Sequence, residues 1–171
     1  MSNAALPLEI ERSYLLRGAP TFPARAEIEA LSIVQGYLPE APPPECPPGR
    51  LRSVVRPDGT TIYFHTVKTG TGLVRTEVER RIDRKEFDAL WPHTAGRRLA
   101  KTRYRVAEGE RVWEIDRFHG IDLVLAEVEL PTPDATVEIP PWLAPLVVRE
   151  VTDEPEYRNS QIALRVHQAV P

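Results

Sequence analysis

The chain has 171 residues, a length typical of one domain with its own core, and we expect a single domain over residues 1–171. Its 25 acidic and 22 basic side chains leave a formal net charge of −3. This balance argues against a general nucleic-acid binder, since such proteins are usually basic. Cys46 is the only cysteine, which excludes an intrachain disulfide and a metal site built from cysteines.

Two further features of the sequence bear on where the protein works. No run of apolar residues approaches the roughly 20 that are needed to span a bilayer. Glu9, Glu11 and Arg12 interrupt the segment in which a signal peptide would be apolar. We therefore expect a cytoplasmic protein without a membrane partner.

Segments with the alternating pattern of a β-strand recur along the chain. Short turn sequences such as PDG and HG separate most of them, which favours antiparallel hairpins. Eight strands joined in this way predict a mainly β (α+β) fold, either a sandwich or a barrel. The predicted strands cover residues 7–17, 33–38, 50–56, 60–68, 73–82, 98–107, 111–118 and 122–130.

Three helical patterns interrupt the strands, at residues 23–32, 83–91 and 153–168. In the second, Asp83 is the predicted N-cap, and a glutamate follows three residues later as in a capping box. In the third, Asp153 is the predicted N-cap, with a proline in the first turn. Two proline-rich stretches, 38–48 and 131–145, are predicted to be loops.

The first predicted strand, LEIERS, carries two carboxylates on one face. Because strand side chains alternate between faces, Glu9 and Glu11 share a face with Ser13, while Ile10 and Arg12 share the other. A single pair of this kind is more often a solvated face than a binding site.

The same alternation recurs in six charged pairs, four acidic and two basic. In each acidic pair the residue between the two charges is Ile or Val, so the opposite strand face is apolar. One arrangement that accounts for all six has the apolar faces packed outward against helices and the charged faces lining a wide, wet lumen. The acidic pairs are Glu9 and Glu11, Glu77 and Glu79, Glu114 and Asp116, and Glu127 and Glu129; the basic pairs are Arg50 and Arg52, and Lys101 and Arg103, with Lys68 as a lone cation.

A lumen with both kinds of charge suits a defined type of ligand. Arg and Lys bind a polyanion through charge-assisted hydrogen bonds. Clustered carboxylates repel one another unless a hard divalent cation, Mg²⁺ or Mn²⁺, lies between them. Together they indicate a phosphoanhydride site. The segment KTGTGLV lacks the ending of a P-loop, so side chains would bind the phosphates.

In this order the pairs resemble the signature of the CYTH domain, or triphosphate tunnel metalloenzyme, family. That signature runs Glu-x-Glu-x-Lys, Arg-x-Arg, Lys, Glu-x-Glu, Lys-x-Arg, Glu-x-Asp, Glu-x-Glu, and the chain shows it as EIERS, RLR, HTVK, EVE, KTR, EID and EVE. The segments QGYL, FDALWPHTAGRRLAKTRY and WEIDRFHG are similar to the small bacterial branch. The resemblance covers residues 7–165. It implies an eight-stranded antiparallel barrel forming a charged tunnel, with flanking helices and a C-terminal helix.

The resemblance also implies an activity and a role for each pair. The activity is metal-dependent hydrolysis of inorganic triphosphate or a related small-molecule triphosphate, by a monomer or a homodimer. An ATP-cyclising enzyme and a phosphate-binding module without turnover are the alternatives. The implied phosphate-binding residues are Arg50, Arg52, Lys68, Lys101 and Arg103. Glu9, Glu11, Glu127 and Glu129 would hold Mg²⁺ or Mn²⁺, and Glu77, Glu79, Glu114 and Asp116 would hold a second metal or activate water.

The chain departs from the family at Ser13, where the signature has lysine. A serine hydroxyl does not replace the lost charge, but Arg56 and Arg105 share the strand face of the binding cations and are candidate replacements. Two other residues have two interpretations each. Tyr37 either meets substrate near the tunnel mouth or packs within the barrel, and Arg158 either closes one tunnel end or lies on a solvated helix face.

Overall fold

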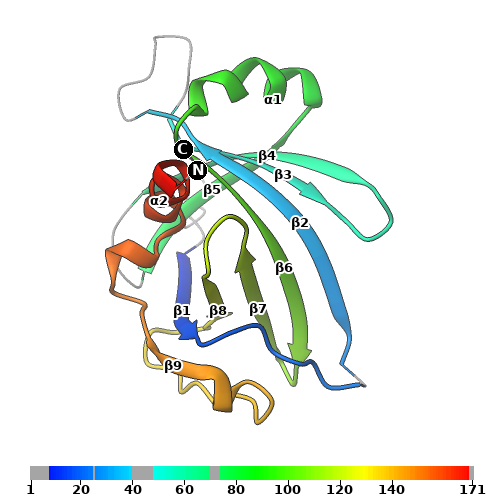
Figure 1. Ribbon diagram of the computed structural model, residues 1–171, viewed down its shortest axis with the longest axis vertical. Helices are drawn as coiled ribbons and strands as arrows, with labels where there is room; N and C mark the ends of the chain where they lie inside the picture. The colour runs from blue at the N-terminus through cyan, green and yellow to red at the C-terminus, as the bar shows by residue number, and fades with distance from the viewer. Residues whose placement is uncertain (1–7, 25, 40–47, 70–73, 170–171) are drawn as a thin grey trace, which may run out of the picture.

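A computed structural model of the protein describes residues 8–24, 26–39, 48–69 and 74–169. Figure 1 shows an antiparallel sheet that curls round on itself, with helices at one end. At 8–9, 68–69, 74–77 and 168–169 the backbone is described but the side chains are not. Most of the first proline-rich stretch, with Cys46, lies outside the described residues.

The described part of the chain forms nine strands, two α-helices and three 3₁₀ turns, and none of these helices is long and apolar enough to cross a membrane. The strands are β1 (Leu8–Leu16), β2 (Ile28–Tyr37), β3 (Arg50–Val55), β4 (Thr61–Thr69), β5 (Val74–Ile82), β6 (Arg98–Glu108), β7 (Arg111–Phe118), β8 (Val124–Glu129) and β9 (Val147–Glu150). The helices are α1 (Arg84–Leu90) and α2 (Asn159–Ala169), and the turns are η1 (Trp91–Thr94), η2 (Ala144–Leu146) and η3 (Pro155–Tyr157).

The strands pair antiparallel in the order β5-β4-β3-β2-β6-β7-β8-β1-β9. β1 also pairs with β5, over Leu8–Ile10 and Val74–Thr76, so the run of strands returns to its start over this short stretch. Further along, β1 pairs with β9 instead. The tunnel-like antiparallel β fold expected from the sequence is confirmed, and β9 is an additional strand that was not predicted.

The helix predicted at 23–32 is wrong, because the second half of that segment, from Ile28 on, belongs to β2. Its Ala and Glu residues favour a helix locally. In the structure, however, Leu31 and Ile33 are buried while Ser32 between them is exposed, which is the period of a strand. β2 pairs with β3 along one edge and with β6 along the other, and this tertiary pairing outweighs the local preference.

The helix predicted at 83–91 is confirmed as α1. Its N-cap Asp83 accepts a hydrogen bond from the backbone N of Glu86 at 2.8 Å. Phe87 packs with Leu51 and other buried side chains, so α1 covers the outer face of the β3–β5 region. Here the expected covering of the barrel by a helix is correct.

The last predicted helix begins later than expected. α2 starts at Asn159, and the predicted cap Asp153 lies before it, in a separate turn. Pro155 opens the 3₁₀ turn η3. Just before this turn, the backbone N of Val151 donates to the carbonyl of Ser13 at 2.8 Å. Pairing with β1 therefore extends to Val151, and a turn and η3 separate it from the start of α2.

The outward faces of β1, β7 and β8 form the largest apolar cluster, which includes Tyr14, Trp113 and Ile115. The predicted cover for such faces was a helix. Instead, the irregular segment 131–146 packs over them with side chains such as Leu143. A proline-rich segment suits this position, because its backbone has fewer N–H donors that would need partners.

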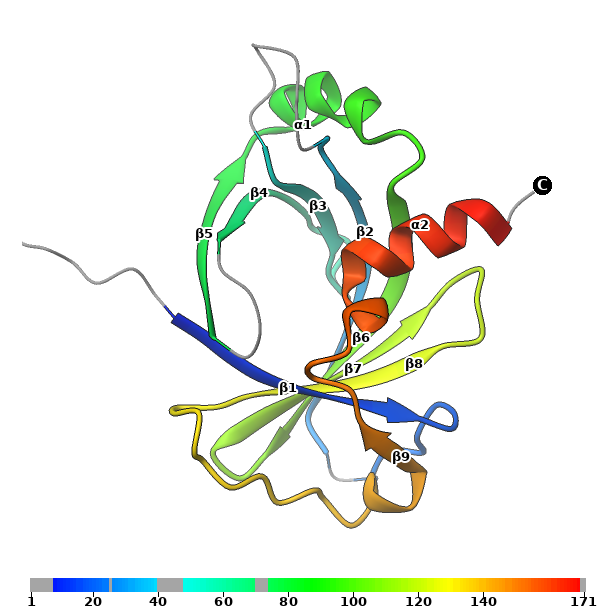
Figure 2. The ribbon, with the colours of Figure 1, turned by 90° about the vertical axis from the view of Figure 1, so that its left-hand side faces the viewer.

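Helix α2 packs on the inward face of the sheet, against β6 (Figure 2). Ile162 and Ala163 are fully buried against side chains that include Leu99 and Leu125. Leu125 lies two residues before Glu127, so it shares a strand face with the charged pairs. α2 thus fills one part of the interior with apolar contacts. The charged part of the interior lies next to the start of the helix.

Candidate functional site

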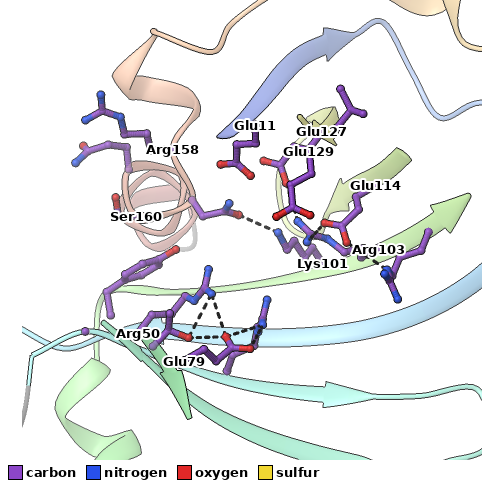
Figure 3. Close-up of a pocket in the computed structure, with 18 of the residues that line it drawn as sticks. Glu11, Arg50, Glu79, Lys101, Arg103, Glu114, Glu127, Glu129, Arg158 and Ser160 are labelled. Carbon is purple, nitrogen blue, oxygen red and sulfur yellow. Dashed lines mark hydrogen bonds and ion pairs between the residues drawn. The ribbon is translucent and has the colours of Figure 1, made fainter. Parts of the chain in front are cut away.

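The charged inward faces surround one large cavity of about 1450 Å³. Figure 3 shows its labelled side chains coming from β1, β3, β5, β6, β7 and β8 and from the start of α2. The cavity therefore gathers residues that are far apart in the sequence. Nine of the 13 predicted site residues line it: Glu11, Arg50, Arg52, Glu79, Lys101, Arg103, Glu114, Glu127 and Glu129.

One group of cations is built on β6 and held by a carboxylate of β7. Asp116 is fully buried and accepts hydrogen bonds from Lys101 Nζ at 2.5 Å and from Arg103 Nε at 2.7 Å. Arg103 also donates from Nη2 to Glu127 Oε2 at 2.7 Å and from Nη1 to Glu114. Asp116 does not line the cavity, although it was predicted to act there. It lies beneath the two cations and fixes their positions.

The ionisation of this group follows from burial and charge together. Burial alone would raise the pKa of Asp116, but the charges of Arg103 and Lys101 hold that pKa well below its usual range. Burial, followed by the charge of Arg103, lowers the pKa of Lys101. Burial would also lower the pKa of Arg103, but Asp116 raises it well above its usual value. Asp116 therefore stays ionised at neutral pH and keeps two mutually repelling cations side by side.

A second group of cations lies on β3, facing β4 and β5. Arg52 Nη2 donates to both carboxylate oxygens of Glu79, at 3.0 and 2.8 Å. Arg50 Nη2 lies 3.6 Å from the same carboxylate. Thr66 is fully buried, and its hydroxyl donates to Glu79 at 2.7 Å while accepting from Arg50 Nη2 at 3.4 Å. Here too the cations are ordered by a carboxylate, but this one lies on the cavity wall.

Three carboxylates on β1 and β8 face the same part of the cavity (Figure 3). Glu11 and Glu129 are direct partners in the β1–β8 register, and Glu127 lies two residues from Glu129. Burial, then the charge of Glu11, then that of Asp116, raise the pKa of Glu127 to about 7. Burial away from water and the neighbouring negative charges both favour the protonated, neutral carboxyl group.

These carboxylates fit a divalent cation in their donor chemistry. Hard ions such as Mg²⁺ and Mn²⁺ take carboxylate oxygens, and Glu11, Glu127 and Glu129 present them to one space. As they stand, the described side chains include no group of three His, Cys, Asp or Glu placed closely enough to hold an ion. The three side chains would therefore have to draw together around it.

Three predicted residues, Glu9, Lys68 and Glu77, have side chains outside the described part of the chain. Their backbone positions are described. Lys68 lies opposite Glu77 in the β4–β5 register, and Glu9 lies opposite Arg75. Their predicted roles stay predictions.

Ser13, the position at which the family signature has lysine, does not line the cavity. Its backbone N donates to Thr152 Oγ1 at 3.1 Å, so the segment before α2 is hydrogen-bonded to the edge of β1 here. Of the two candidate replacements for the missing charge, Arg105 lines the cavity and Arg56 does not. Arg105 pairs with Glu114 at 3.3 Å, on the side of the β6 cations.

The structure adds residues to the site that the sequence analysis missed or left open. Asn159, at the start of α2, accepts a hydrogen bond from Lys101 Nζ at 3.1 Å. The two are 58 residues apart, and no sequence pattern connects them. Thr66 lies two residues before Lys68, so strand alternation could have placed it in the lumen. Tyr37 both lines the cavity and packs in the apolar cluster around α2, and burial raises its pKa to about 12.

The chain is similar to known proteins in sequence and in fold. No family model matches the chain. An inorganic triphosphatase of Nitrosomonas europaea is 38% identical over 164 residues, which cover 92% of this chain and 98% of that protein. An inorganic triphosphatase of Acetivibrio thermocellus is 37% identical over 103 residues, 58% of this chain and 64% of that protein.

Solved structures extend the similarity to the fold. The crystal structure of the inorganic triphosphatase NE1496 matches with a TM-score of 0.59 at 37% identity, over 91% of this chain and 97% of that one. The structure of PH1819 from Pyrococcus horikoshii is 16% identical and matches with a TM-score of 0.51, over 74% of this chain and 80% of that one. The second match shows a shared fold only.

Proposed function

Because this chain belongs to the CYTH family of triphosphate tunnel enzymes, in the branch of the inorganic triphosphatases, we propose that it hydrolyses inorganic triphosphate to pyrophosphate and phosphate with a divalent cation. The observation that carries the proposal is the composition of the cavity. Two groups of basic side chains and a set of three facing carboxylates share one cavity. Cations that bind phosphate and carboxylates that bind metal are the two parts a metal–triphosphate complex requires.

The basic groups supply the phosphate contacts in this proposal. Arg50 and Arg52 reach the cavity from β3, and Lys101 and Arg103 reach it from β6. Guanidinium groups form bidentate, charge-assisted hydrogen bonds with phosphate oxygens. Lys68 is proposed to join them, as the family signature implies. Asp116 is a positioning residue here, because it touches the two β6 cations and not the cavity.

The facing carboxylates are proposed to hold the divalent cation, Mg²⁺ or Mn²⁺. Glu11, Glu127 and Glu129 are the described candidates, and the signature adds Glu9. When bound, such an ion neutralises phosphate oxygens and polarises the bond that breaks. Glu114 and Glu79 line the same cavity and, with Glu77, are proposed to hold a second ion or orient the attacking water.

Phosphate release from tripolyphosphate, with Mg²⁺ or Mn²⁺ and with a chelator as the blank, tests the proposed activity. Thiamine triphosphate and ATP serve as competing substrates, and we expect tripolyphosphate to be turned over fastest. No release of phosphate from tripolyphosphate with either metal would refute the activity.

Glu129→Ala tests the metal assignment separately. We expect at least a tenfold loss of turnover at limiting metal with an unchanged melting temperature, because removing one of several repelling carboxylates costs the metal-free fold little. Glu138→Ala, an exposed glutamate on the segment that covers the outside of the sheet, is the matched control and should behave as the wild type. Near-normal turnover of Glu129→Ala at limiting metal would refute the assignment.

A further inference from the structure

The cations of the cavity are held by carboxylates of two kinds, which differ in where they lie. Asp116 is fully buried and lies behind Lys101 and Arg103, so a ligand in the cavity does not reach it. Glu79 has 27% of its side chain exposed and lies on the cavity wall. The first kind is a permanent support for its cations. The second occupies the side of its cations from which a ligand would approach.

Glu79 occupies the Nη2 group of Arg52, a donor that a phosphate would also use. Both of its oxygens accept from Arg52 Nη2, and Arg50 Nη2 lies 3.6 Å from one of them. A carboxylate and a phosphate present the same pair of acceptor oxygens to a guanidinium group. The two anions therefore compete for Arg52, and Glu79 is already in place.

The position of Glu79 is itself maintained by a buried hydroxyl. Thr66 Oγ1 donates to Glu79 Oε2 at 2.7 Å and is fully buried on the neighbouring strand. The guanidinium of Arg52 also lies 5.3 Å from the ring centroid of Phe64, a cation–π contact that helps to hold it in place. Glu79 is therefore an anion held between a cation and a buried hydroxyl, and a ligand that binds the cation more strongly can displace it.

We propose that Glu79 is a counter-anion that occupies the phosphate-binding arginines of the empty tunnel, and that Thr66 is the residue that positions it. A divalent cation that attracts Glu79 away from Arg52 frees that arginine to bind a triphosphate. Conversely, a triphosphate that displaces Glu79 from Arg52 frees the carboxylate to bind a cation. Binding of the two is mutually reinforcing by the same factor in both directions. This inference rests on the proposed function, since it assumes that the tunnel binds triphosphate.

The test is the affinity for tripolyphosphate measured by calorimetry, with a chelator and then with Mg²⁺, at one ionic strength. Glu79→Gln keeps the shape of the side chain but removes its charge. We expect it to tighten metal-free binding about tenfold and to reduce the gain that Mg²⁺ gives the wild type. Thr66→Val should have the same effect to a smaller degree, and Thr66→Ser, which keeps the hydroxyl, should match the wild type.

Glu129→Gln is the matched control, because it removes the same charge from the same cavity at a residue on β8, a strand that does not pair with β3. It should change metal-free affinity much less than Glu79→Gln does. Equal effects of the two substitutions would mean that only the overall field of the cavity matters, and would overturn the proposal. Unchanged metal-free affinity of Glu79→Gln would also overturn it. A wild type that binds no tripolyphosphate even with Mg²⁺ would refute the proposed function instead.

Discussion

Replacing Asp116 by asparagine tests whether a buried carboxylate holds the β6 cations of the tunnel together. The substitution keeps the size of the side chain and removes its charge. Lys101 and Arg103 would then lie side by side in the interior with their shared counter-ion gone. Asparagine also has an NH₂ group, which would point a donor at cations that already carry only donors.

The expected cost is large, because Asp116 is fully buried and Lys101 is 2% exposed. Removing one partner of a buried ion pair typically costs about 3–5 kcal/mol, since it leaves the other charge without compensation. In a domain of this size, each kcal/mol corresponds to roughly 2–4 °C in melting temperature. We therefore expect Asp116→Asn to melt about 10 °C below the wild type.

The assay is thermal unfolding followed by circular dichroism at neutral pH, with Asp88→Asn as the control. Asp88 pairs with Arg84 on the exposed side of α1, and such pairs contribute roughly 0–1 kcal/mol. The control should melt within a degree or two of the wild type. If Asp116→Asn also melts there, the buried pair does not stabilise the fold and the reasoning fails.

The pH dependence gives an independent check with a defined sign. The pKa of Asp116 is lower in the folded protein than in the unfolded chain, so its contribution to stability is present above the unfolded value, about 4. That contribution is lost as the pH falls through the lower, folded value. The wild type should therefore lose stability on acidification below about pH 4 more steeply than Asp116→Asn. Parallel curves would contradict the assigned ionisation.

Two further predictions concern single positions. Ser13→Lys should lower the melting temperature without tightening tripolyphosphate binding, because position 13 is half-buried and does not line the cavity. Tighter binding at unchanged stability would show that position 13 opens to the ligand. The affinity for Mn²⁺ should be constant well above pH 7 and fall by roughly tenfold per unit below it, because the proposed ligand Glu127 has a pKa of about 7 and must lose its proton to bind. Titrations of Mn²⁺ across this range check the second prediction, and Glu127→Gln should remove most of the slope.

The parts of the site that could be predicted are those encoded by strand alternation. A strand repeats every two residues, so Arg50 with Arg52, and Glu127 with Glu129, had to share a face wherever the strands lay. The structure places all four on the cavity. Strand alternation does not show which of the side chains on the inward face reach the cavity. Asp116 shares its face with Glu114, but only Glu114 reaches the cavity.

The parts that could not be predicted depend on tertiary contacts. The start of β2 has helix-favouring residues, and it became a strand because β3 and β6 pair with both of its edges. Asn159 joins the site because α2 enters the interior and packs against β6. That placement depends on apolar contacts of Ile162 that have no local signature. The same sequence pattern would suit a helix on the outer surface.

The charge of the cavity explains how an acidic protein can accept a polyanion. The chain carries a net charge of −3. Among the described residues that line the cavity, eight are Arg or Lys and six are Glu, so the local balance has the opposite sign from the whole. A divalent cation among the facing carboxylates would shift this balance further toward positive. Charges lining a cleft with low-dielectric walls focus their field into it. The sign of the whole chain therefore argues against a broad nucleic-acid surface and is compatible with a small polyanion bound inside the tunnel.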